Sequence, residues 1–261
     1  DMATILMTGE LWFRIPEIIE VRLEGKAPKG VYPKDVILSV LGKLKADGAV
    51  YKAIDFTGSY VESLNVAGRM VICNMAVEVG AKTAYMQPNR AVLDFISKRA
   101  VRPFEIQYTD SDFEYEESHV FDVSALEPLL ACPNSVDNVD TLVNVTDGKT
   151  VELTEGYIGS CTGGREEDLA VAAEILHGKK IPKYTSLVVV PASSEVMQSC
   201  LEKGYIQDLM SAGATIATPG CGACLGAHEG IIAPGEVCIS STNRNFPGRM
   251  GSTQAKIYLA S

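Results

Sequence analysis

The sequence predicts an α/β fold with mostly parallel sheets, and three observations support this prediction. Short runs of branched apolar residues alternate with helical patterns along the chain, as in residues 50–56 followed by 66–79. Three of the expected strands run directly into polar or cysteine-bearing loops, and ligands of α/β proteins bind at the carboxyl ends of strands. The composition, 46% hydrophobic and 21% charged, is that of an ordinary globular chain with an ample core.

The first half of the chain predicts alternating strands and helices. The expected elements are the end of a helix at 1–13, strands at 18–23, 50–56 and 83–86, and helices at 33–48, 66–79 and 91–98. Pro33 suits a first helical position, and Gly48 and Gly80 are expected to stop the helices before them. The acidic stretch 104–123 lacks a clear period, which indicates a loop and an edge strand near a domain boundary. A solvated face explains its charge, and a metal site is the alternative.

The second half repeats the alternation. It predicts strands at 156–159, 187–190, 214–217 and 236–240, and helices at 166–176, 195–201 and 206–210. The first of these strands ends beside Cys161, the third beside Cys221 and Cys224, and the last beside Arg244. Because ligand-binding loops gather at the carboxyl ends of parallel strands, these four residues are expected on one edge of a sheet.

Charge and cysteine content narrow the functional classes. The chain has 261 residues and a formal net charge of −10, which disfavours nucleic acid as a partner. No apolar run approaches the length of a membrane span, and no signal peptide is visible at the start. Seven cysteines, an odd number, predict a reducing compartment and a cytoplasmic location.

Three of the cysteines lie on glycine-rich turns. Cys161 follows a strand within 159–164, and Cys221 and Cys224 share the turn 220–226. Glycine allows close backbone approach, and three thiolates on converging loops suit an iron–sulfur cluster that keeps one iron open for chemistry. The alternatives are a redox pair, a zinc site completed by His228, and a phosphate loop at 159–164, although the nucleotide-binding signatures are missing there.

Polar residues elsewhere point to an anionic ligand. Arg244 and Arg249 share one Pro/Gly turn, and arginine forks bind carboxylates, so a substrate with more than one carboxylate is expected. Surface ion pairs are the alternative explanation. Asn74 and Glu78 lie one turn apart in an apolar helix, so that face is expected to look onto a polar site, a solvent-exposed stripe being the alternative.

Together these motifs resemble the aconitase superfamily, and most closely the large subunits of 3-isopropylmalate dehydratases. The resemblance lies in segments 73–78, 158–162, 220–226 and 242–249, which occur in family order, and it covers essentially the whole chain. It implies three-layer α/β/α subdomains with central, mostly parallel sheets. Residues 1–22 would be the tail of an incomplete first subdomain, 23–125 the second subdomain, and 126–261 the third, with the cysteines.

The resemblance also implies a chemistry. Cys161, Cys221 and Cys224 match ligands of a [4Fe–4S] cluster, and Arg244 and Arg249 match the arginines that hold substrate carboxylates. Asn74 and Asn243 match residues that are hydrogen-bonded around the cluster, and Glu78 matches an acid that pairs with a catalytic histidine. The implied reaction is a hydro-lyase isomerisation of 2- and 3-isopropylmalate in leucine biosynthesis. Homoaconitate and dimethylmalate enzymes, or a non-catalytic zinc module, are the alternatives.

The sequence departs from the family pattern at three places. Gly163 stands where the family usually has Asn, which removes an expected contact near the cluster. The family's early histidine and aspartate motifs do not occur in these 261 residues. The family's serine base belongs to a swivelling domain, in these enzymes a separate small subunit. The chain is therefore expected to need that partner and to be inactive alone.

Overall fold

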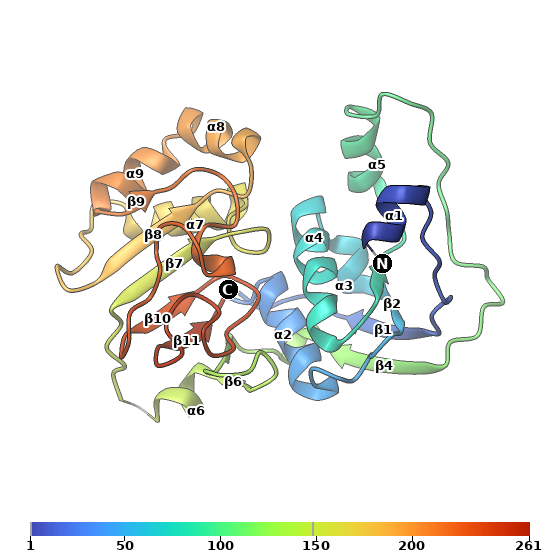
Figure 1. Ribbon diagram of the computed structural model, residues 1–261, viewed down its shortest axis with the longest axis horizontal. Helices are drawn as coiled ribbons and strands as arrows, with labels where there is room; N and C mark the ends of the chain where they lie inside the picture. The colour runs from blue at the N-terminus through green and yellow to red at the C-terminus, as the bar shows by residue number, and fades with distance from the viewer. Residues whose placement is uncertain (1, 148) are drawn as a thin grey trace.

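The computed structural model describes residues 2–147 and 149–261, which form two sheets with helices around them (Figure 1). The elements before the second sheet are α1 (Met2–Thr8), β1 (Ile18–Glu24), α2 (Pro33–Leu44), β2 (Ala53–Thr57), α3 (Ser59–Ser63), α4 (Val66–Met75), the 3₁₀ helix η1 (Ala76–Val79), β3 (Thr83–Tyr85), α5 (Arg90–Ser97), β4 (Glu117–Asp122) and the 3₁₀ helix η2 (Val123–Ala125). The remaining elements are β5 (Leu129–Ala131), β6 (Val139–Thr141), α6 (Leu142–Thr146), β7 (Glu155–Gly159), α7 (Glu166–Leu176), β8 (Ser186–Val190), α8 (Ser194–Glu202), α9 (Tyr205–Ala212), β9 (Thr215–Ile216), the 3₁₀ helix η3 (Gly222–Leu225), β10 (Val237–Ser240) and β11 (Lys256–Leu259).

Both sheets are mostly parallel, which confirms the predicted α/β class. The first has the order β3-β2-β1-β4 and is parallel throughout. The second has the order β6-β5-β11-β10-β7-β8-β9, in which only the pairings of β5 with β6 and with β11 are antiparallel. Strand β4 pairs with β1 alone, so the expected edge strand in the acidic stretch is confirmed.

The core joins the two sheets. One continuous set of buried side chains includes Ile19 and Ile37 on the side of the first sheet and Tyr157 and Ile257 on the side of the second. Helix α2 lies between the sheets (Figure 1). A second, smaller core packs α7, α8 and α9 against one face of the second sheet, over Val189. Burial of this apolar surface is the dominant stabilising contribution to such a fold.

Several predicted boundaries differ from those observed. The helix expected over 66–79 ends at Met75 and tightens into η1, so Glu78 lies on a 3₁₀ turn. Helix α2 ends at Leu44 instead of running to Gly48, because Lys45 adopts a φ of 68° that breaks the helical backbone. Residues 22 and 23 both belong to β1, which pairs with β2 and β4, and the predicted start of the second subdomain at residue 23 stays a prediction. The division into residues 23–125 and 126–261 stays a prediction.

None of the helices among the described residues has the length and apolarity needed to cross a membrane.

Candidate functional site

The first part of the candidate site follows β7. Ser160 adopts a left-handed backbone with φ of 69°, which turns the chain sharply at the end of the strand and places Cys161 at the surface. The Ser160 hydroxyl is buried and, among the described residues, has no hydrogen-bond partner. The turn therefore presents an exposed thiol beside a buried hydroxyl that can still accept or donate a hydrogen bond.

The second cysteine loop is fastened to the ends of β7 and β8. The Gly220 N–H donates to the Pro191 carbonyl oxygen over 3.2 Å, and the Tyr157 hydroxyl donates to the Cys221 carbonyl oxygen over 2.9 Å. Gly222 has a φ of 51°, and a Cβ there would collide with the Tyr157 hydroxyl oxygen. A glycine is therefore required for this close approach. In this loop, Cys221 is exposed and Cys224 is buried.

The third part follows β10. The Asn243 side-chain amide nitrogen lies 3.7 Å from the Cys161 sulfur, within reach of a weak N–H···S hydrogen bond. Its amide oxygen accepts a hydrogen bond from the Thr162 hydroxyl. The asparagine thus connects the loop after β10 to the turn after β7, so the carboxyl ends of β7, β8 and β10 are linked around the cysteine loops.

An ion pair brings the first sheet's elements to this edge. The Arg244 Nε atom lies 2.6 Å from the Glu78 Oε1 atom, and Asn74 lies half-buried one turn earlier on α4. Burial raises the pKa of Glu78, and the hydrogen bond and charge of Arg244, with the charge of Arg249, oppose that rise. The Arg249 guanidinium carbon lies 5.6 Å from the centroid of the Phe246 ring. Its buried Nε atom has no hydrogen-bond partner in the described part of the chain.

Gly163, the departure from the family pattern, has a structural explanation. A Cβ at this position would collide with the Ser241 Oγ and Cβ atoms. The Ser241 hydroxyl accepts a hydrogen bond from the Gly159 N–H over 2.9 Å and donates one to the Gly163 carbonyl oxygen over 3.2 Å. Ser241 therefore occupies the space next to residue 163, and its hydroxyl joins the loops after β7 and β10.

Lys34 is a buried residue of the site that sequence reasoning missed. It is the second residue of α2, and its ammonium donates to the Thr162 hydroxyl over 3.1 Å and to the Ser241 and Thr242 carbonyl oxygens over 2.5 and 2.8 Å. A lysine beside an apolar helical stripe normally indicates a surface position, so only the folded arrangement identifies it.

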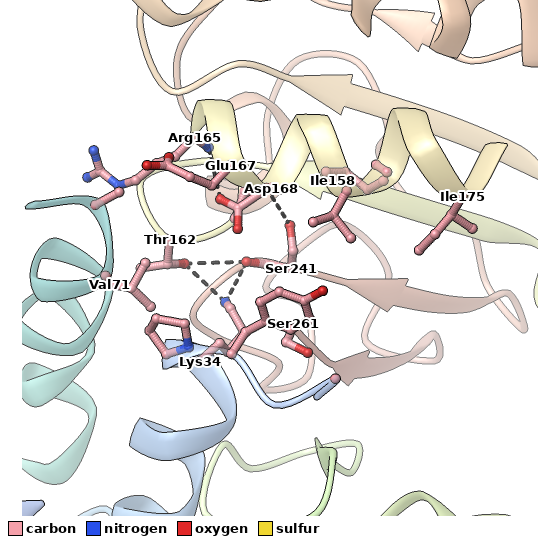
Figure 2. Close-up of a pocket in the computed structure, with 18 of the residues that line it drawn as sticks. Lys34, Val71, Ile158, Thr162, Arg165, Glu167, Asp168, Ile175, Ser241 and Ser261 are labelled. Carbon is pink, nitrogen blue, oxygen red and sulfur yellow. Dashed lines mark hydrogen bonds between the residues drawn. The ribbon is translucent and has the colours of Figure 1, made fainter. Parts of the chain in front are cut away.

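A cavity of about 680 Å³ lies behind these loops (Figure 2). Lys34, Thr162 and Ser241 lie at its polar end, and Val71, Ile158 and Ile175 contribute to its apolar wall. The lining residues do not include the three predicted cysteine ligands or the two arginines. The cavity and the cysteine loops are therefore separate features, connected through Thr162, which follows Cys161, and Ser241, which lies two residues before Asn243.

The described residues do not form a compact site for a single metal ion. Among residues 2–147 and 149–261, no three His, Cys, Asp or Glu side chains gather tightly enough to hold a single ion. The alternative of a zinc site completed by His228 stays a prediction. A four-iron cluster takes each thiolate at a different corner, so its ligands do not need to touch one another.

Comparison with known proteins places the chain in a family. The aconitase family (aconitate hydratase) matches residues 1–261. A probable methanogen homoaconitase large subunit of Methanothermobacter thermautotrophicus is 47% identical over 260 residues, which cover 100% of this chain and 60% of that protein. A 3-isopropylmalate dehydratase large subunit of Methanopyrus kandleri is 47% identical over 264 residues, covering 100% of this chain and 62% of that protein.

Among solved structures, the holo form of Thermococcus kodakaraensis aconitase X covers 92% of this chain and 53% of its own, with a TM-score of 0.49 and 13% identity. The chain spans roughly three-fifths of the length of the two curated relatives, which are 60% and 62% covered. With its whole length matched, the chain belongs to the aconitase family.

Proposed function

We propose that Cys161, Cys221 and Cys224 hold a [4Fe–4S] cluster. The observation that carries the proposal is that the Tyr157 hydroxyl fastens the Cys221 loop to β7, the strand that leads to Cys161, while Asn243 approaches the Cys161 sulfur from the loop after β10. The donor set suits the group, because cysteine thiolates are the usual ligands of such clusters. Backbone turns rich in glycine allow the loops to approach a bulky anion closely.

We further propose that the cluster serves a hydro-lyase reaction on a hydroxy-dicarboxylic acid. When bound, a cluster with one iron lacking a protein thiolate supplies a Lewis acid for a substrate hydroxyl. Arg249 supports the proposal. Its Nε donor is buried and has no hydrogen-bond partner among the described residues, so it is free to bind a substrate carboxylate. Arg244, held by Glu78, supplies a second guanidinium beside it.

The residues of this chain have distinct proposed roles. Arg244 and Arg249 bind and orient the substrate carboxylates. Asn243 donates a hydrogen bond to the Cys161 sulfur. Asn74 lies on α4, four residues before Glu78. Glu78 accepts a 2.6 Å hydrogen bond from the Arg244 Nε atom and so orients that guanidinium, and burial raises its pKa while Arg244 opposes the rise. Its second proposed role, implied by the family resemblance, is to orient a catalytic histidine.

The proposed substrate pair is 2- and 3-isopropylmalate, and the proposed partner is a small subunit that carries the swivelling domain and a serine base. The names of the relatives support a large-subunit role. A homoaconitase is the second candidate, favoured by two methanogen homoaconitase large subunits at 47% and 48% identity.

The test is anaerobic reconstitution followed by an assay with each substrate. The chain loaded with iron and sulfide is mixed with 2-isopropylmalate or with homocitrate, each with and without an added small subunit, and products are separated by chromatography. We expect no turnover by the chain alone and conversion of isopropylmalate with the partner present. Turnover without a partner would contradict the subunit proposal, and conversion of homocitrate only would favour the second candidate.

A further inference from the structure

Lys34 is an ammonium buried between the two sheets of the molecule. It is 3% exposed and leaves the first turn of α2. Its three acceptors are the Thr162 hydroxyl and the carbonyl oxygens of Ser241 and Thr242. A neutral amine has only two N–H groups, so donation to three oxygen atoms requires the charged form.

This charge lies in a place that disfavours it. Burying a cation without a paired anion is costly, and the positive end of the α2 helix dipole adds repulsion. Among the described residues, no carboxylate lies within the 4.0 Å of an ion pair with Lys34. Burial lowers the pKa of Lys34 to about 8, and negative charge on Asp168, Cys161, Cys224 and Asp35 works against that lowering.

The contacts of Lys34 join the strand ends that carry the cysteine site. Thr162 follows Cys161, and its hydroxyl donates in turn to Asn243, whose amide approaches the Cys161 sulfur. The Ser241 and Thr242 carbonyls belong to the loop just before Asn243. Figure 2 shows the ammonium pointing at Thr162 and Ser241 from behind these loops.

We propose that Lys34 is a positioning residue for the thiol site, holding the loops of Cys161 and Asn243 together and supplying a fixed positive charge beside the turn that carries Cys161. This role rests on the proposed function, because the anionic group to be compensated is the thiolate-bound cluster. A cluster and its thiolates carry net negative charge, which accounts for keeping a buried cation without a carboxylate partner.

The experiment compares three variants of the full chain. Lys34→Gln keeps N–H donors but removes the charge, Lys34→Arg keeps the charge, and the exposed Lys29→Gln is the matched control for loss of one positive charge. Each protein is reconstituted anaerobically, and the midpoint potential of the cluster is measured by dithionite titration monitored by electron paramagnetic resonance. Hydrogen exchange of the metal-free proteins at segments 160–164 and 241–245 is the second measurement.

Removal of a nearby positive charge makes addition of an electron harder. We expect Lys34→Gln to lower the equilibrium constant for one-electron reduction about tenfold, which is about 59 mV toward negative potential. Lys34→Arg and Lys29→Gln should keep the wild-type potential. In the metal-free proteins, exchange at both segments should quicken about tenfold in Lys34→Gln and stay unchanged in Lys29→Gln.

Each outcome decides the proposal. A loaded Lys34→Gln protein with the wild-type potential overturns the countercharge, and an Arg variant shifted as far as the Gln variant does the same. If Lys34→Gln does not fold, Lys34→Arg decides alone, since a retained potential supports the role and a shifted one contradicts it. Failure of the wild-type chain to take up iron counts against the proposed function, and hydrogen exchange then still tests whether Lys34 joins the loops.

Discussion

The two ends of strand β7 differ in the buried polar atoms that lack a hydrogen-bond partner. At the carboxyl end, the unpartnered buried atoms among the described residues include the Ser160 hydroxyl and the Arg249 Nε donor. At the amino end, the unpartnered atom is an acceptor, the Oε1 atom of Glu155, whose other oxygen accepts a 3.3 Å hydrogen bond from the Ser186 hydroxyl.

The difference supports the proposed ligand site at the carboxyl end. Donors left over around exposed thiols suit an anionic group from outside the chain, because a buried donor without a partner is costly. At the amino end, the unpartnered atom belongs to a carboxyl group that can itself bind a proton. Burial raises the pKa of Glu155 to about 7, opposed by the Ser186 hydroxyl and helped by the charge of Glu236, so burial favours the protonated form of this carboxyl.

The largest expected effect tests the donors at the carboxyl end. In the proposed assembly with a small subunit, Arg249→Ala should lower kcat/KM by about 10²-fold to 10³-fold, because a preorganised charged donor is lost. Steady-state kinetics measure this, with the exposed Arg102→Ala as control. An Arg249→Ala enzyme as active as the control would show that this guanidinium does not face the substrate.

The next effect tests the amino end through pH. Glu155 binds its proton more tightly when folded than when unfolded, so its stabilising contribution is complete below the ordinary pKa of 4.5 and is lost as pH rises through about 7. The unfolding free energy of the wild type should fall relative to Glu155→Gln by about 3 kcal/mol over that interval. Urea titrations at several pH values measure it.

The exposed Glu174→Gln on α7 is the control for that experiment, and it should follow the wild-type pH dependence. Parallel curves for wild type and Glu155→Gln would mean that Glu155 is ionised in the folded protein, and the contrast between the two strand ends would disappear.

The smallest expected effect tests the packing of Gly163 against Ser241 at the carboxyl end of β7. Gly163→Ala should reduce stability by about 1–3 kcal/mol, because the new methyl group collides with the Ser241 side chain. Adding Ser241→Gly to that variant should recover part of the loss. Gly156→Ala, in the same strand but facing the movable end of Leu187 at 3.0 Å, is the control, and thermal unfolding is the measurement. Equal losses in both single variants would contradict the explanation of Gly163.

Sequence patterns predicted the strands that lead to the cysteine loops because apolar runs and glycine turns are local signals. They missed β5, β6 and β11. Lys34 and the approach of Ser241 to Gly163 were also missed, since both depend on contacts between residues 207 and 78 positions apart. The merged helix prediction for 66–79 failed because apolar spacing does not distinguish the last α turn from the 3₁₀ turn η1.

The central claim is that Cys161, Cys221 and Cys224 hold one iron–sulfur cluster, and iron and sulfide content after anaerobic reconstitution tests it most directly. The wild type and Cys132→Ser should each take up about four iron and four sulfide per chain, with visible charge-transfer absorbance. Serine at any one of positions 161, 221 or 224 should abolish most of this uptake. Equal uptake by the wild type and all three variants, or no uptake by the wild type, would contradict the account.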